Sequence, residues 1–136
     1  MSVQLALLGQ PQIFCDERSV VLPKKAVGLL AYLATHSEPQ PRDQLIELLW
    51  PERDPVAGRK DMRNTLWVIR RALGNETVTS QAGRLALAAE VWVDVQVFTH
   101  LNRLDLYRGP FLDGLYVDDA PDFEQWMVSE QAHWQA

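Results

Sequence analysis

The sequence has few of the features that mark secreted or membrane proteins. Cys15 is the one cysteine among 136 residues, so the chain forms no intrachain disulfide, which fits a reducing cytoplasm. The longest apolar run, residues 26–34, is far shorter than the roughly 20 residues that span a bilayer. No basic leader precedes an apolar run at the N-terminus, as a secretory signal requires. We therefore expect a cytoplasmic protein with no membrane segment.

The sequence also lacks the residue groupings of catalytic and metal sites. The three histidines, His36, His100 and His133, lie far apart, and none has a second ligand at metal-binding spacing. The seven glycines are scattered and form no phosphate-binding loop, and no G-x-S-x-G turn is present. Asp118 and Asp119 form a carboxylate pair without a neighbouring proton relay. We therefore expect a protein that is not an enzyme and holds no metal and no cofactor.

Positive charge is scarce overall, but it is unevenly distributed. The net charge is −5, yet residues 1–89 hold 11 basic and 9 acidic residues, while residues 90–136 hold 2 basic and 9 acidic residues. This asymmetry suggests two parts with different partners. The apolar content of 47% is enough to build a core, and the length fits one domain or a domain followed by a fragment.

The segment 59–73 combines an apolar stripe with five of the 13 basic residues. At 3.6 residues per turn, one narrow stripe of a helix holds the apolar residues Met62, Leu66, Ile69 and Leu73. The adjoining arc carries five cations, an amide and an indole: Arg59, Lys60, Arg63, Asn64, Trp67, Arg70 and Arg71. Two interpretations fit this arc. It is either a solvated surface or the face of a helix that enters the DNA major groove, where Arg and Asn read base edges and cations neutralise phosphates.

The order of the elements predicts an α+β fold of the winged-helix type. The patterns indicate, in order, strands at 3–7, 12–14 and 19–22, helices at 23–36, 42–49 and 56–73, a hairpin of 77–80 with 84–87, and a strand at 91–93. An N-terminal antiparallel sheet, three helices and a hairpin wing follow from that order. Gly74 is placed to end the third helix, and Arg84 lies at the tip of the wing.

Lys24 and Lys25 are unusual because they lie in the first turn of the helix at 23–36. The helix macrodipole disfavours cations at this end. The two lysines are there either by chance or because an anion such as a phosphate approaches them, and the sequence leaves both interpretations open.

Three runs carry a resemblance to a known family: 45–51 (LIELLWP), 62–66 (MRNTL) and 69–74 (IRRALG). In order and spacing they resemble the DNA-binding domain of SARP-type bacterial transcriptional activators, whose fold is like the OmpR/PhoB winged helix. The opening of the bacterial transcriptional activator domain, a helical, TPR-like unit, is similar to the runs at 93–98, 107–112 and 122–126. The resemblance implies a DNA-binding domain over 1–93 and part of a helical domain over 94–136.

The resemblance also implies a function and a set of contacts. It implies a sequence-specific transcriptional activator that places helix 56–73 in the major groove of direct repeats in promoters. The residues nearest the bases would be Arg59, Lys60, Arg63, Asn64 and Trp67, with Arg70 and Arg71 on the DNA backbone. Arg84 would reach the minor groove or its phosphates, and the loop 51–55 would face RNA polymerase. The alternative is a protein-interaction module that keeps the winged-helix scaffold without binding DNA.

The last part of the chain predicts two helices. Asp94 is placed to cap a helix whose apolar residues are Val95, Phe98 and Leu101. Pro121 opens a final helix that carries the large apolar residues Phe123, Trp126, Met127 and Trp134. These side chains are either part of the core or an exposed face through which the protein self-associates.

Overall fold

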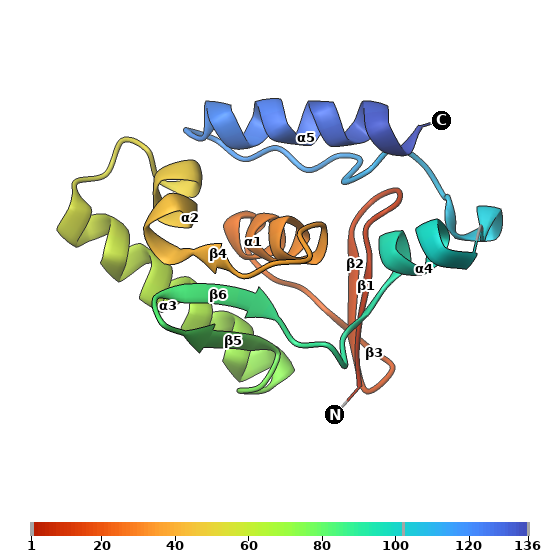
Figure 1. Cartoon of the computed structure of the whole chain (residues 1–136), viewed down its shortest axis with the longest axis horizontal. Coiled ribbons are helices and arrows are strands. Elements are labelled where there is room, and N and C mark those ends of the chain that lie inside the picture. The colour runs from red at the N-terminus through yellow and green to blue at the C-terminus, as the bar shows by residue number, and fades with distance from the viewer. Residues whose placement is uncertain (1, 102, 136) are drawn as a thin grey trace.

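The computed structural model in Figure 1 describes residues 2–101 and 103–135, without the side chains of residues 99–101. The expectations for the side chains of His100 and Leu101 therefore lie outside the described residues. Along the chain the elements are β1 (Val3–Ala6), β2 (Gln12–Cys15), β3 (Arg18–Val20), α1 (Lys24–Ala34), β4 (Gln40–Pro41), α2 (Arg42–Leu49), α3 (Pro55–Leu73), β5 (Val78–Gln81), β6 (Arg84–Leu87), β7 (Trp92–Val93), α4 (Asp94–Leu101), the 3-10 helix η1 (Leu104–Leu106) and α5 (Pro121–Trp134).

The N-terminal sheet has the strand order β3-β2-β1-β7. β1, β2 and β3 pair antiparallel, and a tight turn at Asp16 and Glu17, both with positive φ, joins the last two. The expected strand at 91–93 is present as β7, but it pairs parallel to β1. The sheet is therefore mixed, because the chain returns to β1 after crossing the wing.

The winged-helix order is confirmed, with three helices followed by the β5–β6 hairpin. Ala82 and Gly83, both with positive φ, form the two-residue turn of this wing. The sequence did not predict β4, which pairs with β6 and makes the wing a three-stranded sheet in the order β4-β6-β5. This pairing fixes the start of α2 beside the wing, where the Arg42 backbone N–H donates to the Gly83 carbonyl oxygen at 2.9 Å.

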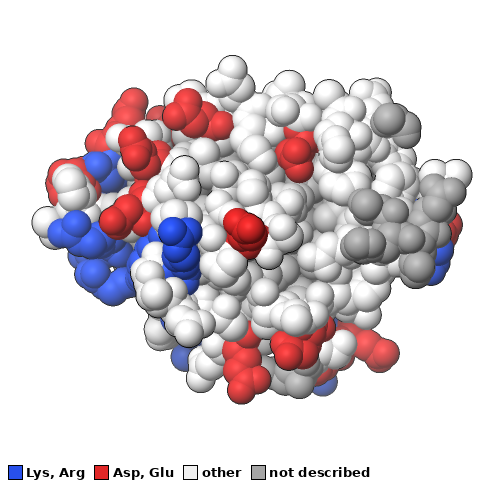
Figure 2. Space-filling model, viewed as in Figure 1, with Lys and Arg blue, Asp and Glu red and all other residues white. Residues whose placement is uncertain are grey.

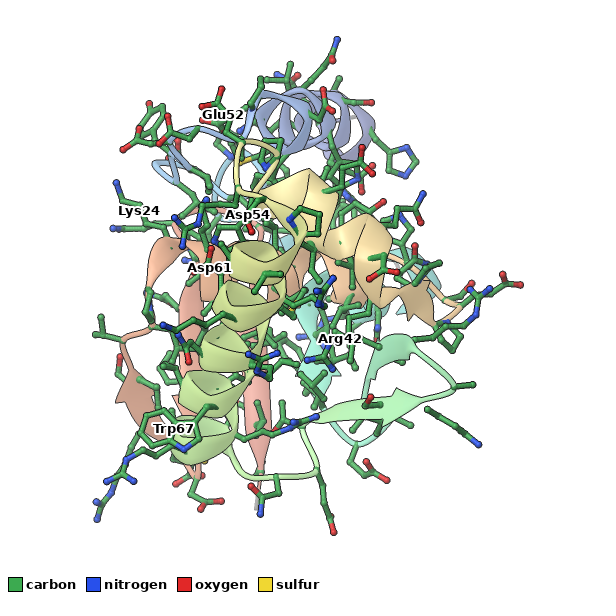
Figure 3. The ribbon with its side chains drawn as sticks, turned by 90° about the vertical axis from the view of Figure 1, so that its left-hand side faces the viewer. Lys24, Arg42, Glu52, Asp54, Asp61 and Trp67 are labelled. Atoms are coloured by element: carbon green, nitrogen blue, oxygen red, sulfur yellow. The ribbon has the colours of Figure 1, made fainter. Side chains whose placement is uncertain are left out.

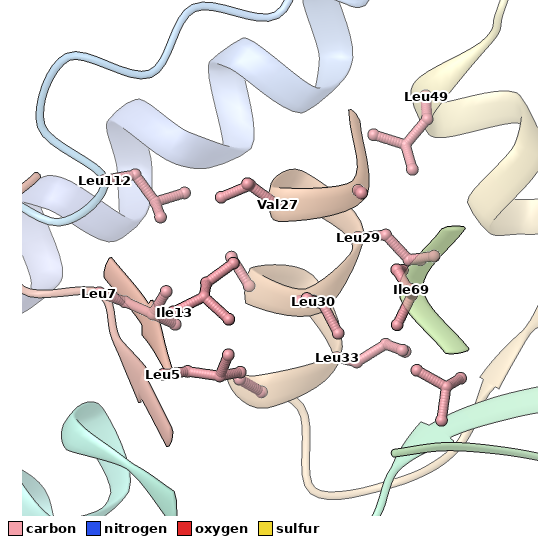
Figure 4. Close-up of a cluster of buried hydrophobic side chains, with 14 of the residues drawn as sticks. Leu5, Leu7, Ile13, Val27, Leu29, Leu30, Leu33, Leu49, Ile69 and Leu112 are labelled. Carbon is pink, nitrogen blue, oxygen red and sulfur yellow. The ribbon is translucent and has the colours of Figure 1, made fainter. Parts of the chain in front are cut away.

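The core lies around α1, which is buried on nearly every side. Figure 4 shows the sheet approaching α1 with Leu5, Leu7 and Ile13, and α3 approaching it with Ile69 from the opposite side. The predicted apolar stripe of α3 is the buried stripe, since Met62, Leu66, Ile69 and Leu73 are each at most 1% exposed. The 3.6-residue period therefore identified which side of α3 faces the body.

Residues 107–120 run back along the N-terminal sheet and lead into α5, which lies across the top of the molecule in Figure 1. The Leu112 backbone N–H donates to the Leu7 carbonyl oxygen at 2.8 Å, and Phe111 forms a bridge with Leu8. The Phe123 ring of α5 packs onto Gly28 of α1, with both residues buried. The C-terminal segment thus shares the core of the winged helix.

The interpretation of α5 as an exposed aromatic face is wrong. Phe123 and Met127 are buried at 0% and 5% exposure, and Trp126 and Trp134 pack partly buried against the core. The Trp126 ring lies 4.8 Å from the Tyr32 ring of α1, centroid to centroid. Phe123 and Met127 belong to the core and the two tryptophans pack at its edge, so the burial of these side chains gives no support to self-association through them.

Asp94 begins α4, and its carboxylate reaches across to the sheet. The carboxylate accepts the backbone N–H groups of Leu7 and Leu8 at 2.9 Å, and the residue is 1% exposed. Asp94 therefore joins the start of α4 to the end of β1. Within the described residues, no helix is long and apolar enough to cross a membrane.

Candidate nucleic-acid interface

α3 begins and ends at residues whose chemistry defines its limits. The Asp54 carboxylate accepts the Ala57 backbone N–H at 2.9 Å, which caps the first turn, and Pro55 follows at the first helical position. Gly74 ends the helix with a φ of 105°, a backbone conformation that favours glycine. The result is one helix of 19 residues with a buried stripe and a polar outer side.

The arc beside the buried stripe faces solvent. We call the residues Arg59, Lys60, Arg63, Asn64, Trp67, Arg70 and Arg71 the basic arc; all are exposed except the half-buried Arg70. In the part of the chain that the structure describes, the ion pairs are Arg53 with Asp61 and Arg103 with Asp105, each at 2.8 Å. The cations of the basic arc are therefore not neutralised by carboxylates there. Figure 2 shows Lys and Arg gathered at the end of the molecule where α3 lies.

A groove of about 550 Å³ runs along the C-terminal half of the basic arc. Its lining contains no carboxylate and includes four arginines, Arg42, Arg63, Arg70 and Arg71, together with Leu66, Trp67 and Asn75. Sequence reasoning missed Arg42 and Asn75, because Arg42 comes from the start of α2 and Asn75 follows α3. Figure 3 shows Arg42 beside α3, which is where the β4–β6 pairing places it.

Trp67 is the large aromatic residue of the basic arc, and the residue is 61% exposed. The guanidinium carbon of Arg71, one turn further along α3, lies 5.2 Å from the centre of its ring. This is a cation–π arrangement, which orders both side chains on the outer side of the helix. An ordered guanidinium loses less conformational freedom when it meets a phosphate oxygen.

Two of the residues predicted to bind DNA lie on the wing side of α3. Arg84 is exposed beside the turn at the tip of the wing and pairs with Gln81 across the hairpin. Arg70 is turned toward the same hairpin, because its Nη2 donates to the Val78 carbonyl oxygen of β5 at 3.2 Å. The structure therefore brings Arg70 to the wing and leaves Arg84 free to face outward.

The two lysines of α1 lie apart from this interface. Lys25 is half-buried; its Nζ donates to the Leu49 carbonyl oxygen at 2.6 Å and lies 5.3 Å from the Trp50 ring centre. Burial lowers the pKa of Lys25, while the carboxylates of Asp119 and Asp61 raise it. Lys25 thus caps the C-terminus of α2, where the macrodipole favours a cation. Lys24 is exposed, and Figure 3 shows it on the side of α3 opposite Arg42.

The loop between α2 and α3 is held by contacts at both ends. The Arg53 Nε donates to Asp61 of α3 at 2.8 Å, and the Arg53 backbone N–H donates to the Trp50 carbonyl oxygen. Glu52 and Asp54 are exposed in the same loop, and Figure 3 shows them above the N-terminal end of α3. The end of the molecule above the basic arc is therefore acidic.

No protein-family model and no curated protein matches the chain by sequence. A solved structure does match, that of Mycobacterium tuberculosis EmbR in complex with a low-affinity phosphopeptide, with a TM-score of 0.70 and 21% identity. The match covers 96% of this chain and 42% of the EmbR chain, so the chain spans less than half of that protein. EmbR is a SARP-family regulator with an OmpR-like winged-helix DNA-binding domain. The chain therefore has the fold of the EmbR winged-helix region, with its N-terminal sheet, helices and β-hairpin.

Proposed function

We propose that this chain is a sequence-specific DNA-binding protein that activates transcription. The observation that carries the proposal is the exposed basic arc of α3, whose cations have no carboxylate partner among the described residues. The net charge of the chain is −5, yet these cations lie without carboxylate partners on one face of a helix. Such a face is suited to bind a polyanion. The likeness to the winged-helix region of EmbR supports the same function.

In this proposal, α3 lies in the major groove and the wing lies on the minor groove. Arg59, Lys60, Arg63 and Asn64 are nearest the base edges, because the N-terminal half of a recognition helix reads them. Trp67 lies at the edge of this contact, against sugar or a thymine methyl group. Arg71 contacts the DNA backbone, and Arg84 reaches the minor groove from the wing tip.

The finer parts of the proposal concern partners and location. The loop 51–55 meets RNA polymerase, and the sites are direct repeats in promoters, so successive protomers bind head to tail. The protein then works in the bacterial cytoplasm, on the nucleoid. The loop 51–55 is held in place by the Arg53–Asp61 hydrogen bond and by Asp54, which caps α3, and this favours a preformed docking surface over a flexible one.

The alternative function is a protein-interaction module that does not bind DNA. The acidic C-terminal half, which holds 2 basic and 9 acidic residues over 90–136, would then dock the partner. This alternative gives no role to the unpaired cations of α3. DNA binding by the purified chain separates the two functions directly.

The experiment is a selection of bound duplexes from a random pool, followed by affinity measurements on the selected and a scrambled duplex. Arg63→Ala is expected to lower the preference for the selected sequence, since one bidentate base contact contributes about 1–3 kcal/mol of discrimination. Arg71→Ala is expected to weaken both duplexes alike, because a phosphate contact carries no sequence information.

Arg103→Ala is the matched control. Arg103 is exposed, lies next to η1 away from α3, and its removal changes the net charge by the same amount. If Arg63→Ala and Arg71→Ala bind both duplexes as the wild type does, α3 is not the DNA-binding helix. If no sequence is enriched and no duplex binds, the interaction-module function stands instead.

A further inference from the structure

Arg70 differs from the other cations of the basic arc in where its side chain goes. It is half-buried, and its Nη2 donates to the carbonyl oxygen of Val78, the first residue of β5, at 3.2 Å. Val78 itself is 1% exposed. The Arg70 side chain therefore spans from the last turn of the recognition helix to the base of the wing.

The Arg70 guanidinium directs part of its donor set into the fold. Its Nε is buried and has no hydrogen-bond partner among the described residues. Removing a donor from water without a new acceptor costs free energy, so the position of this side chain is maintained by the packing around it. The contact between Arg70 and β5 is thus part of the folded structure, and Arg70 differs in this from a solvent-exposed cation that is available to a phosphate.

The connection that Arg70 crosses is short, and further hydrogen bonds hold the hairpin at its foot and near its tip. The Thr77 Oγ1 donates to the Leu73 carbonyl oxygen at 2.9 Å, and the Ala88 N–H donates to the Thr77 carbonyl oxygen at 2.8 Å. These bonds fix the foot of the hairpin. Nearer the tip, the Gly83 carbonyl oxygen accepts the Arg42 backbone N–H at 2.9 Å, and Arg84 pairs with Pro41 of β4. The Arg70 contact adds a bond from the side chain of α3 to β5. Figures 1 and 3 show β5 and β6 beside α3, so a tilt of the hairpin changes the distance from the wing tip to the helix.

We propose that Arg70 is a positioning residue that fixes the wing against the recognition helix, so that Arg84 and α3 meet one DNA duplex together. This rests on the proposed function, in which α3 and the wing bind adjacent grooves. It assigns Arg70 a different role from the backbone contact that its place on the basic arc suggests. Arg70 then acts on DNA affinity through Arg84.

The test is a double-mutant cycle of Arg70→Met and Arg84→Ala, measured on a duplex that the wild type binds. Met keeps the apolar stem of Arg70 and removes its donors. Arg70→Met is expected to weaken binding about tenfold when Arg84 is present, and less than about twofold when Arg84 is already Ala. In the Arg84→Ala background, Arg70→Met is expected to leave the slope of log affinity against log salt unchanged, because Arg70 itself neutralises no phosphate.

A direct phosphate contact gives the opposite pattern and overturns the inference. The weakening would then be the same in both backgrounds, and the salt slope would fall by about 0.9. Arg70→Lys, which keeps a cationic donor, is expected to retain most of the affinity. An Arg70→Lys variant that loses about as much affinity with Arg84 present as with Arg84→Ala would contradict a role that acts through Arg84.

A measurement without DNA separates this inference from the proposed function. Amide hydrogen exchange of residues 78–87 is expected to become about tenfold faster in Arg70→Met, with exchange in α1 unchanged as an internal reference. If the wing exchanges at the wild-type rate, Arg70 does not hold it. If the wing is loosened and the wild type binds no duplex, the positioning holds and the DNA-binding proposal fails.

Discussion

At the scale of single residues, the fold shifts the pKa of Asp94, a buried carboxyl that joins α4 to the N-terminal sheet. Its carboxylate accepts two N–H groups from β1 at a site that is 1% exposed. Burial raises the pKa of this carboxyl, and the N–H groups of Leu7 and Leu8 act in the opposite direction. The net direction is upward from the ordinary value of 3.8.

This direction predicts how stability depends on pH. A carboxyl that holds its proton to a higher pH when folded contributes stability that is fully present below pH 3.8 and is lost as pH rises through the folded pKa. Asp94→Asn cannot titrate and serves as the reference. Urea unfolding from about pH 4 to 7 is expected to show the wild type losing stability relative to Asp94→Asn as pH rises. If the free energy of unfolding of the wild type instead increases relative to that of Asp94→Asn as pH rises, the pKa of Asp94 is not raised.

At the scale of elements, the close packing of α5 on α1 depends on a glycine. A Cβ added at Gly28 would lie 2.8 Å from the Cζ of Phe123, which is fully buried. The ring therefore occupies the space that a side chain at Gly28 would need. This packing joins the C-terminal segment to the central helix of the winged helix.

Gly28→Ala is therefore expected to destabilise the chain, although alanine is the better helix former by about 1 kcal/mol. Overpacking against the ring costs about 1–3 kcal/mol, which outweighs that gain. In a Phe123→Leu background the ring is absent, and the same substitution is expected to be neutral or stabilising. Urea denaturation of the wild type, the two single variants and the double variant measures both effects. A Gly28→Ala variant that is more stable than the wild type would contradict the close contact.

Elements with strong local patterns were predicted from the sequence. The apolar period of α3 identified its buried side, and the Gln81-Ala82-Gly83 stretch identified the wing turn. β4 and the parallel β1–β7 pair were not predicted, since both pair residues distant in sequence and both strands are two residues long. The strand at 91–93 was predicted, but a local pattern does not identify the strand with which it pairs, and the two residues of β4 carry no alternation from which to recognise a strand.

The candidate site was predicted only in part, because some of its residues are brought together by contacts between distant parts of the sequence. A helical wheel places Arg70 and Arg71 on one arc, but it cannot show that Arg70 contacts the wing while Arg71 does not. Arg42 joins the groove through tertiary pairing, and the Lys25 ammonium donates to the Leu49 carbonyl oxygen at the end of α2, a contact that no local pattern predicts. The division into domains at residue 93 stays a prediction, and the shared core shows that the two parts are packed together.

At the scale of the whole molecule, positive charge is concentrated in α3 and negative charge in residues 90–136. Residues 90–136 hold 2 basic and 9 acidic residues, while α3 alone holds five of the 13 cations. Figure 2 shows acidic side chains above the basic region at the same end of the molecule. Such a distribution steers an approaching polyanion to α3 and away from the acidic surface.

The most direct measurement of DNA binding by the basic arc is the salt dependence of affinity in two charge-matched double variants. Arg59→Ala with Arg71→Ala removes two cations of the arc, and Arg18→Ala with Arg103→Ala removes two exposed cations elsewhere. From about 50 to 200 mM salt, the first double variant is expected to lower the log–log slope by about 0.9 for each phosphate that it no longer neutralises, while the second keeps the wild-type slope. Equal slopes in the two double variants would contradict DNA binding through α3.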